Sequence, residues 1–546
     1  MTLLFFLIDT EYLYSAPKII TTFLKIIHIL FCKIIHILFN IYWSFKKKHT
    51  LPHIKNDLLK LSAVNCSELI RQKALTSTEL VGSYIERQIE INPIINGIME
   101  KNYFQALKTA NDIDNFLKHF DADSEDYNCL IEEKPLLGIP FTVSNSIVVK
   151  NFKSTCGIVQ RTSFKRSGTV VNQGVERLIE AGAIPIASSN VSQLCMWIEC
   201  NNKVTGRTNN PYDSRRTSGG SSGGEAALIA SGASLFGVGS SIIGSITIPA
   251  SFCGIYAYKP TSEKFLCDGH IPEITQSMTS LACISIMSRY ANDLYYISRI
   301  FFNNNDLLPK SNPIEIKELK YFYLEDINFM QAQPIHSTCR YAINKVTDAL
   351  YFNYGITSIK VEFEELRSAY DMWLATLQVA TNKDMNDIYG LLTNFHPTKV
   401  VNNIREVNAN ILGLKSDYDL GMLLEETNLT LLRSFCNIKI QKYLNIKKNL
   451  CEKIEKLLGD NGILIAPAFA VPAPYHNQQI FTRIDHIYGS IFCALGFPVI
   501  TCPVFHTSFG IPMNVQLIGK KNNDKVLFPL AEALEKTLGG WKEGKN

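Results

Sequence analysis

The feature that most constrains the fold is a central stretch, residues 217–250, in which glycine and serine alternate with large aliphatic side chains. The small residues gather at 219–224 and again at 237–245. A flexible linker has the same small residues, but it lacks the leucine, isoleucine and phenylalanine residues that separate them here. Glycine lets the backbone approach another group closely, and successive N–H groups in such turns can converge on an anion. The stretch therefore predicts buried, ordered turns around a short helix at 225–231.

Two familiar glycine-containing motifs and the usual metal-binding patterns are missing. The chain has no GxxxxGK[ST] phosphate loop, and residues 244–247, Gly-Ser-Ile-Thr, break the GxSxG pattern of a nucleophile elbow. The eleven histidines show no HExxH spacing, and the fourteen cysteines are scattered, with Cys195 and Cys200 making a poor zinc site. We therefore expect no metal, no cofactor and mostly free thiols in a reducing compartment.

Composition and charge further narrow the class of protein to which the chain can belong. Of the 546 residues, 46% are hydrophobic and 19% charged, which is globular composition and rules out a mainly disordered chain. The net charge of +4 arises entirely within residues 1–50, where six lysines face two acids. The rest of the chain is neutral, so a basic face that would hold nucleic acid is not expected.

Residues 19–45 form a strongly apolar segment in which the heptapeptide KIIHILF occurs twice. Its length suits a membrane span of about 20 residues. At 100° per residue, one side of the helix would carry a polar stripe, made of Lys25, His28, Cys32, Lys33, His36 and Asn40. The helix could span a membrane with this stripe against a partner, lie in the membrane interface, or dock on the globular body. We expect membrane association, with membrane lipid as a partner.

The flanks of this segment bear on its processing and orientation. No small-residue cleavage site follows it, which disfavours a removable signal peptide. The basic residues 46–48 come directly after it, and the positive-inside tendency then places the large domain in the cytoplasm. We take residues 1–50 as a hydrophobic membrane anchor with a basic flank, and residues 51–546 as the main domain.

The main domain shows alternating helix and strand patterns, which indicate an α/β layered fold. Thr76 and Glu79 fit a capping box at the start of a helix that should end before Pro93. Residues 175–184 resemble a helix that closes at a glycine, and short buried strands are expected at 184–187 and 462–467. Residues 300–460 are helical, richer in charge and poor in glycine, and we interpret them as a helical cap or insertion.

From residue 51 to the carboxyl end, the chain resembles the amidase signature family. The similarity lies in several strings that occur in the family's order: LLGIPFTV (136–143), AGAIPI (181–186), GRTNNPYD (206–213), GGSSGGE (219–225), GSSIIGSITIPASFCG (239–254), PAPYHN (472–477), LGFP (495–498) and GIPMNVQLIG (510–519). The amino-terminal segment, NNPYD and PAPYHN are most similar to the fatty-acid amide hydrolase 2 branch of that family. The resemblance implies an α/β/α sandwich around a mixed sheet.

The resemblance also implies a catalytic arrangement of two serines and a lysine. The nucleophile position matches Ser245, and the bridging serine, which follows a cis peptide in the family, matches Ser221. The backbone N–H groups of the family's oxyanion hole match those of Ile242, Ile243, Gly244 and Ser245. A hydroxyl is a weak nucleophile until a base removes its proton, and preorganised N–H donors stabilise the oxyanion that then develops.

The expected base is missing. The family pattern G-x-P-x-x-V-K-[DE] reads here with Ser144 in place of the lysine and Asn145 in place of the acid. A serine hydroxyl is too weak a base and its side chain is too short, and loss of a general base costs about 10²–10⁴-fold in rate. We expect Lys150 to be an ordinary surface residue, and we consider Lys203 and Lys259 still weaker substitutes for the base.

Further departures from the family pattern lie near the same site. Ser241 replaces an acid, Ile243 a glycine and Thr247 an arginine, and Asn514 replaces a glycine of GLPxGxQ. The acid and the arginine are lost together, as expected if one ion pair has been removed, because either charge buried alone would be costly. A β-branched residue at 243 could misplace the oxyanion donors.

Three functions follow as hypotheses. The first is a catalytically impaired or inactive member of the family that binds fatty-acyl amides or esters at a membrane. The second is an active serine hydrolase of such amides or esters, with Ser245 as nucleophile and a non-standard base. The third is a membrane-bound scaffold that uses the anchor and the 300–460 region. The sequence leaves the acyl chain, the leaving group and the oligomeric state open.

Overall fold

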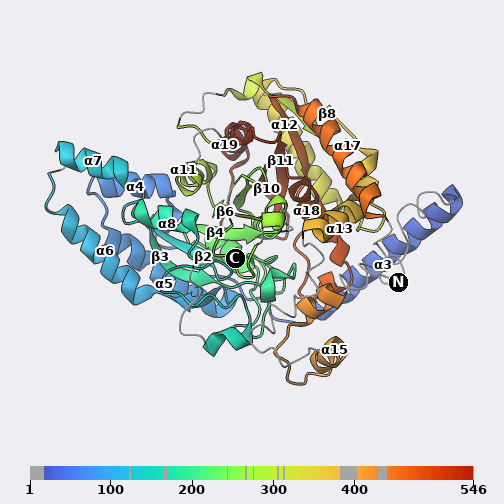
Figure 1. Ribbon diagram of the computed structural model, residues 1–546, viewed down its shortest axis with the longest axis horizontal. Coiled ribbons are helices and arrows are strands. Elements are labelled where there is room, and N and C mark those ends of the chain that lie inside the picture. Colours follow the sequence, from blue (N-terminus) through green and yellow to red (C-terminus); the bar gives the residue numbers. More distant parts are fainter. Residues whose placement is uncertain are drawn as a thin grey trace.

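An eleven-stranded mixed sheet runs through the centre of the computed structural model (Figure 1). The structure describes residues 17–121, 124–163, 170–242, 244–264, 267–274, 276–303, 307–310, 314–380, 402–427 and 439–544. Within them the strands stand in the order β1-β3-β2-β4-β6-β5-β10-β11-β9-β7-β8. Their bounds are β1 Ile98–Lys101, β2 Pro140–Ser144, β3 Ile184–Ser189, β4 Phe236–Ser241, β5 Tyr256–Lys259, β6 Cys283–Ser288, β7 Lys320–Tyr323, β8 Ile359–Lys360, β9 Gly462–Pro467, β10 Val499–His506 and β11 Pro512–Gly519.

The sheet has parallel pairs near both ends, antiparallel pairs in the middle, and β1 paired antiparallel with β3 at one edge. Strand β2 pairs in parallel with β3 and β4, and β7 pairs in parallel with β8 and β9. The strands between β4 and β9 pair antiparallel. Strands β7 and β8 come from the 300–460 region, so this region supplies one edge of the sheet as well as helices, which the sequence interpretation did not anticipate.

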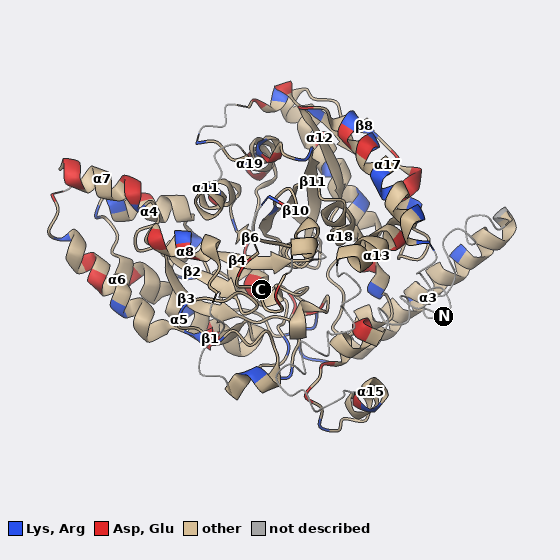
Figure 2. Ribbon diagram, in the orientation of Figure 1, with Lys and Arg blue, Asp and Glu red and all other residues tan. Residues whose placement is uncertain are grey.

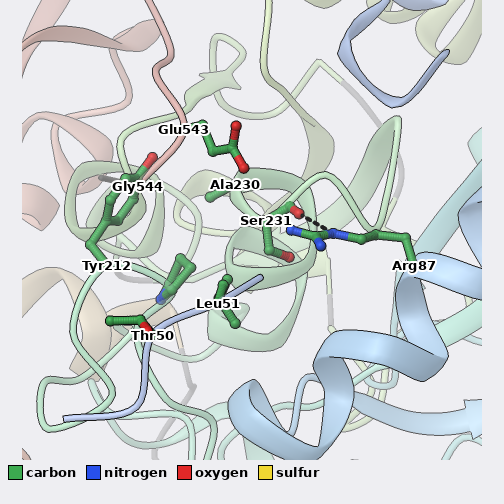
Figure 3. Close-up of a pocket in the computed structure, with 9 residues that line it drawn as sticks. Thr50, Leu51, Arg87, Tyr212, Ala230, Ser231, Glu543 and Gly544 are labelled. Carbon is green, nitrogen blue, oxygen red and sulfur yellow. Dashed lines mark hydrogen bonds between the residues drawn. The ribbon is translucent and has the colours of Figure 1, made fainter. Parts of the chain in front are cut away.

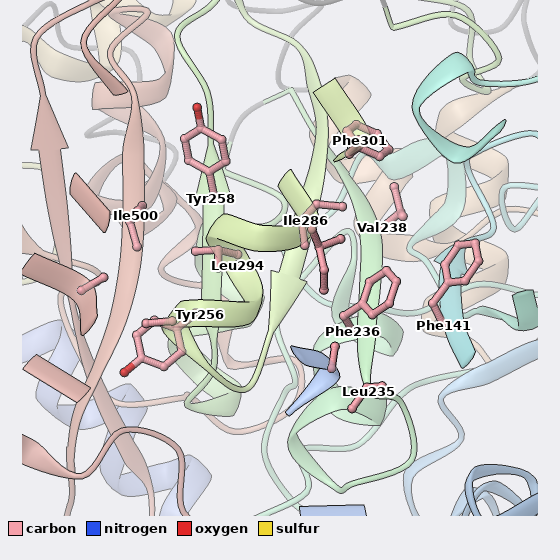
Figure 4. Packing of buried hydrophobic residues seen from close by; sticks show 14 of the residues in the cluster. Phe141, Leu235, Phe236, Val238, Tyr256, Tyr258, Ile286, Leu294, Phe301 and Ile500 are labelled. Carbon is pink, nitrogen blue, oxygen red and sulfur yellow. The ribbon is translucent and has the colours of Figure 1, made fainter. Parts of the chain in front are cut away.

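Helices cover both faces of the sheet, as expected for an α/β/α sandwich. In β9, Ile463 and Ile465 pack into one hydrophobic cluster while Leu464 packs into another, because successive strand residues point to opposite faces. Figure 4 shows part of the first cluster, in which Phe141 and Phe236 lie side by side. The helices are α3 Lys18–Ser44, α4 Ala63–Arg71, α5 Ser77–Ile95, α6 Tyr103–Leu117, α7 Glu125–Glu133, α8 Gln173–Glu180, α9 Gly223–Ala230, α10 Thr247–Cys253, α11 Ala291–Phe302, α12 Ser337–Tyr354, α13 Ala369–Ala380, α15 Asn403–Ile411, α17 Ile440–Leu458, α18 Ile487–Ala494 and α19 Leu527–Leu538.

Most of the local predictions are confirmed, and one helix end is wrong. The Thr76 side chain accepts a hydrogen bond from the Glu79 N–H at 3.2 Å, and β9 spans the predicted residues 462–467. Helix α5, however, continues through Pro93 to Ile95. Its end is held by Asn92, whose side-chain oxygen accepts the N–H groups of the two residues after the C-cap, so the helix stops where these bonds form rather than at the proline.

Helix α3 docks on the body through a side that buries His28, Cys32 and Ile35, while Lys25 and Lys33 of the polar stripe stay exposed. The His28 ring nitrogen Nε2 is 3.2 Å from the Ala332 carbonyl oxygen. Tyr475 donates a hydrogen bond to the Asn40 side chain at 3.0 Å and stacks on Trp43. The outward face exposes a row of large apolar side chains, namely Ile19, Ile20, Phe23, Ile26, Leu30, Ile34, Ile37, Leu38, Ile41, Tyr42 and Phe45. Charge colouring leaves this helix tan over most of its length (Figure 2).

The chain that follows α3 enters the body beside the carboxyl-terminal segment. The Ile54 N–H donates to a Glu543 carboxylate oxygen at 2.6 Å, and the Tyr212 hydroxyl donates to the Lys542 carbonyl at 2.9 Å. A small hollow forms there (Figure 3). Arg87 is one of the residues that line it, and its side chain donates a hydrogen bond to the Ser231 carbonyl. The hollow contains none of the three serines that the sequence places in the catalytic site.

Candidate active site

Ser144 is the last residue of β2, at the carboxyl end of the parallel strands. It pairs in register with Ser189 of β3 and is fully buried. Its hydroxyl oxygen is 3.4 Å from that of Ser146. A lysine at this position would start from a rigid strand end and point toward the neighbouring turns, whereas the serine side chain reaches only Ser146.

The glycine-serine turn at 219–224 stands directly beside the turn that carries Ser245. The Gly220–Ser221 peptide is cis. The Ser222 N–H donates to the Ser245 carbonyl at 3.1 Å, which joins the two turns. Glycine is required at 220, because a Cβ there would lie 2.5 Å from the Trp197 carbonyl oxygen.

Ser221 is fully buried, and its environment is the main finding at this site. Within the described residues its hydroxyl makes no direct hydrogen bond, and the Cys195 thiol is its polar neighbour. No ammonium group of that part of the chain therefore lies within bonding reach of it. Lys150 and Lys203 are exposed, and the buried Lys259 ammonium bonds to the Ser262 hydroxyl at 2.8 Å and to a backbone carbonyl.

Ser245 lies between β4 and α10 with 8% of its surface exposed. Two of the four N–H groups expected to form the oxyanion hole are engaged elsewhere: those of Gly244 and Ser245 donate to the Ser241 hydroxyl at 3.0 and 2.9 Å. Ile242 is half-buried, and Ile243 lies outside the described residues. The serine that replaces the family acid thus binds the backbone of this turn.

Thr247 stands where the family has arginine, and it holds the other side of the same turn. Its hydroxyl donates to the Gly244 carbonyl at 3.1 Å and to the Gly489 carbonyl at 2.9 Å. Gly244 has a φ of 87° and leaves no room for a Cβ, which would lie 2.8 Å from the Gly489 carbonyl oxygen. Two neutral hydroxyls, Ser241 and Thr247, therefore hold the Gly244 peptide where the family has a charged pair.

A hydrogen-bonded chain of hydroxyls leads from the missing lysine position to a histidine. Ser146 Oγ is 2.9 Å from Ser240 Oγ, which is 2.9 Å from His270 Nε2. The other ring nitrogen, Nδ1, is 2.6 Å from the Pro272 carbonyl oxygen, which only accepts hydrogen bonds. The neutral imidazole therefore carries its hydrogen on Nδ1 and offers Nε2 as an acceptor to Ser240.

Cys195 lies beside both His270 and Ser221. The hydrogen bond with the Cys156 thiol holds the pKa of Cys195 well below its ordinary value; His270 and the Ser221 hydroxyl act in the same direction, and burial opposes them. Neither His270 nor Cys195 was a candidate from the sequence, because they are 75 residues apart and neither sits in a recognisable motif. Only the folded chain brings them together.

Two buried carboxylates, those of Glu225 and Glu199, join segments of the chain around the site. The Glu225 carboxylate accepts hydrogen bonds from Thr142 and, at 2.6 Å, from Ser189, and burial raises its pKa to about 7. Glu199 accepts a hydrogen bond from His476 and another from the backbone of Asn477 at 2.9 Å. Because these bonds join distant segments, we interpret both carboxylates as structural.

Asn145, which stands in place of the second family acid, organises the loop after β2. Its side-chain amide donates to the Ser188 hydroxyl at 2.8 Å. Its side-chain oxygen accepts the backbone N–H groups of Thr155 and Cys156 at 2.8 and 3.1 Å.

The described residues include no group of three or more histidine, cysteine or acidic side chains placed to hold a metal ion.

Comparison with known proteins agrees with this architecture. A family model described as Amidase matches residues 79–528. Fatty-acid amide hydrolase 2 of Homo sapiens is 31% identical over 506 residues, covering 91% of this chain and 92% of that protein. Fatty-acid amide hydrolase 2-A of Danio rerio is likewise 31% identical over 506 residues, covering 90% of this chain and 91% of that protein.

Solved structures share the fold at lower identity. A structure of fatty acid amide hydrolase superposes with a TM-score of 0.67 at 20% identity, covering 88% of this chain and 86% of that one. A structure of 6-aminohexanoate cyclic dimer hydrolase gives a TM-score of 0.70 at 19% identity, covering 89% and 98%. These similarities establish the sandwich around the mixed sheet.

Proposed function

Because the chain belongs to the amidase family, we propose that it retains the family's fold and its two hydroxyl groups but has lost the general base, so that amide hydrolysis is severely impaired or absent. The observation that supports this most directly is Ser144 at the end of β2 together with the Ser221 hydroxyl, which has no amine within reach to accept its proton among the described residues. Without such an acceptor, the Ser245 hydroxyl is not converted to a strong nucleophile.

The oxyanion turn supports the same conclusion. An oxyanion is stabilised when preorganised N–H donors point at it in a water-excluded site, and removal of one donor costs about 10²–10³-fold in rate. The Gly244 and Ser245 N–H groups instead donate to Ser241. Nucleophile activation and oxyanion stabilisation are therefore both weakened, and the two effects compound because these groups act as a unit.

The ligand that fits this proposal is a fatty-acyl amide or ester that reaches the protein from a membrane. The relatives of similar length are named fatty-acid amide hydrolase 2, and helix α3 presents a continuous apolar face to the outside. Binding at a membrane then persists where hydrolysis has been lost. The basic residues 46–48 at the end of α3 favour an orientation with the large domain on the cytoplasmic side.

Covalent labelling of Ser245 by a serine-reactive fluorophosphonate tests the proposal. We expect labelling at neutral pH to be at least about 10²-fold slower than that of human fatty-acid amide hydrolase 2 under the same conditions. The Ser245→Ala variant provides the background, and thermal unfolding of both proteins checks that they are folded. Labelling as fast as that of the human enzyme would contradict the proposal.

A second candidate is an active serine hydrolase with a non-standard base, and His270 is the observation that favours it. The imidazole contacts Ser240 through Nε2 and lies beside Cys195, which in turn neighbours Ser221. A proton from Ser221 could then pass to the thiolate–imidazole pair instead of to a lysine. This function requires hydrolysis of a fatty-acyl ester or amide that is lost in both Ser245→Ala and His270→Gln. Hydrolysis that survives either substitution would exclude it.

A further inference from the structure

Two thiols meet at the edge of the candidate site. The sulfur atoms of Cys156 and Cys195 are 3.7 Å apart. Of the thirteen cysteines that the structure describes, these are the only two whose sulfurs lie within hydrogen-bonding distance of each other. Cys156 is fully buried, whereas Cys195 is partly exposed. Cys195 is therefore the more exposed residue of the pair, and Cys156 is the fully buried one.

The backbone holds the two residues together. The N–H of Leu194 donates to the Cys156 carbonyl at 3.0 Å, so the two segments are bonded one residue away from the sulfur pair. Asn145 anchors Cys156 from the other side through a 3.1 Å hydrogen bond to its N–H. Both cysteines lie outside the sheet and the α-helices, where a small adjustment is possible. Closing a disulfide of about 2.05 Å requires the sulfurs to approach by less than 2 Å from their 3.7 Å separation.

The surroundings distinguish the two sulfurs chemically. The Cys156 hydrogen bond and then His270 lower the pKa of Cys195, which favours the thiolate there. Burial, followed by the neighbouring Cys195, raises the pKa of Cys156, which keeps its proton. A low-pKa cysteine that is the more exposed of two adjacent cysteines is the one that oxidation selects, because the thiolate is the reactive form.

We propose that Cys195 is an oxidation site for hydroperoxides and that Cys156 resolves it to an intramolecular disulfide. In the first step the Cys195 thiolate attacks the outer oxygen of the peroxide: an S–O bond forms, the O–O bond breaks, and the leaving oxygen takes a proton as water or alcohol. The sulfur loses two electrons and the peroxide gains them. In the second step the Cys156 sulfur displaces hydroxide from the sulfenic acid, an S–S bond forms, and the Cys156 proton leaves with the hydroxide as water.

This reaction is independent of hydrolysis at Ser245. It uses neither serine as a reacting group, so the fluorophosphonate experiment can succeed or fail without affecting it. The oxidation of Cys195 would nevertheless affect the candidate active site, because Cys195 lies beside the Ser221 hydroxyl. Oxidation would move the Cys195 sulfur toward Cys156 and change the environment of Ser221.

The test uses the purified full chain, kept reduced and then exposed to hydrogen peroxide. After the remaining thiols are alkylated, mass spectrometry of the digest measures each cysteine. We expect a peptide linked through Cys156 and Cys195, and loss of free Cys195 at least about tenfold faster than loss of Cys129, an exposed thiol that serves as an internal control. Equal rates for Cys195 and Cys129, or a disulfide to a different cysteine, would overturn the proposal.

Three variants assign the roles. In Cys156→Ser the sulfenic acid at Cys195 should persist and be trapped by a cyclic 1,3-dione, whereas in Cys195→Ser residue 156 should stay reduced. His270→Gln should slow the oxidation of Cys195. Cys200→Ser is the matched control, because Cys200 is buried nearby and bonds to Thr208 instead of to the pair. Oxidation of Cys195 that is unaffected by His270→Gln and untrappable in Cys156→Ser would contradict the assignment.

Discussion

At the scale of single residues, the serine at 144 carries the proposed loss of the base. It occupies a fully buried strand end and joins a chain of hydroxyls that ends at His270. A lysine there would need a partner for its charge, or a lowered pKa, to remain buried. On this proposal, serine replaces the base without leaving an unpaired charge in the interior.

Restoring the amine is the first prediction at this scale. We expect Ser144→Lys to speed fluorophosphonate labelling of Ser245 by about 10²-fold or more, because a neutral amine can accept the proton relayed through Ser221. Ser144→Met is the matched control, since it adds similar bulk without a base. If Ser144→Lys folds but labels no faster than Ser144→Met, the turn at Gly244 and Ser245 limits the chemistry instead.

Glu225 gives a prediction for pH. Burial raises its pKa from 4.5 to about 7 in the folded protein, despite its bonds to Ser189 and Thr142. As pH rises between these values the unfolded chain loses its proton first, so this residue's contribution to stability falls across that window and is constant above it. Through Glu225, the unfolding free energy should fall by roughly 3 kcal/mol between about pH 4.5 and 7.5, and we expect Glu225→Gln to abolish this part of the fall. Unfolding free energies of both proteins measured over the same pH range check this. An unchanged pH profile would show that Glu225 does not titrate there.

At the scale of elements, α3 presents most of its large apolar side chains to the outside of its own protein. His28 and Asn40 of its polar stripe meet Ala332 and Tyr475, while more than ten large apolar side chains face outward. An exposed apolar row of this length marks a surface for a membrane or a partner. The docked side favours a helix that lies on the membrane rather than one that spans it alone.

The apolar face of α3 should carry the membrane affinity. We expect the combined change of Phe23, Leu30 and Ile37 to serine to lower partition onto lipid vesicles by about 10²–10³-fold, because each side chain loses roughly 1 kcal/mol of apolar burial in the lipid. Vesicle flotation measures the effect. The control changes three apolar residues that are even more exposed but lie away from α3, namely Phe104, Phe352 and Phe509, to serine. Equal losses in the two triple variants would mean that α3 has no special role.

At the scale of the whole molecule, the sheet order brings the site together. Strands β2 and β4 are neighbours although about 95 residues separate them along the chain. Between them Phe141 and Phe236 stack with ring centroids 5.3 Å apart. This contact packs the beginning of β4 against β2, the two strands whose far ends carry Ser144 and lead into the Ser245 turn.

Truncation of this contact should therefore be costly. We expect Phe236→Ala to lower the unfolding free energy by about 3–5 kcal/mol, through lost apolar burial and the cavity left behind. Thermal or denaturant unfolding followed by circular dichroism measures the change. Phe104→Ala, at a phenylalanine that is 84% exposed, is the control and should change stability by less than about 0.5 kcal/mol. A similar loss in both variants would refute the role given to this pair.

What the sequence determined by itself was local or motif-based. A short apolar run bounded by glycine and proline was enough for β9, side-chain capping for the start of α5, and the strings that resemble the family for the positions of Ser144, Ser221 and Ser245. These signals are readable because hydrogen bonds within a turn and the facing of side chains depend on residues close together in the chain.

Only the tertiary structure decided which groups surround those serines. His270 and Cys195 reach the site through the pairing of strands and loops from separate parts of the chain, as does the contact of Cys195 with Cys156. The contact of Asn40 in α3 with Tyr475 is also one between distant residues. Such contacts depend on strand order and packing, which no local pattern encodes, and so Ser144 was visible in the sequence as the reason to propose a lost base, while its neighbours were not.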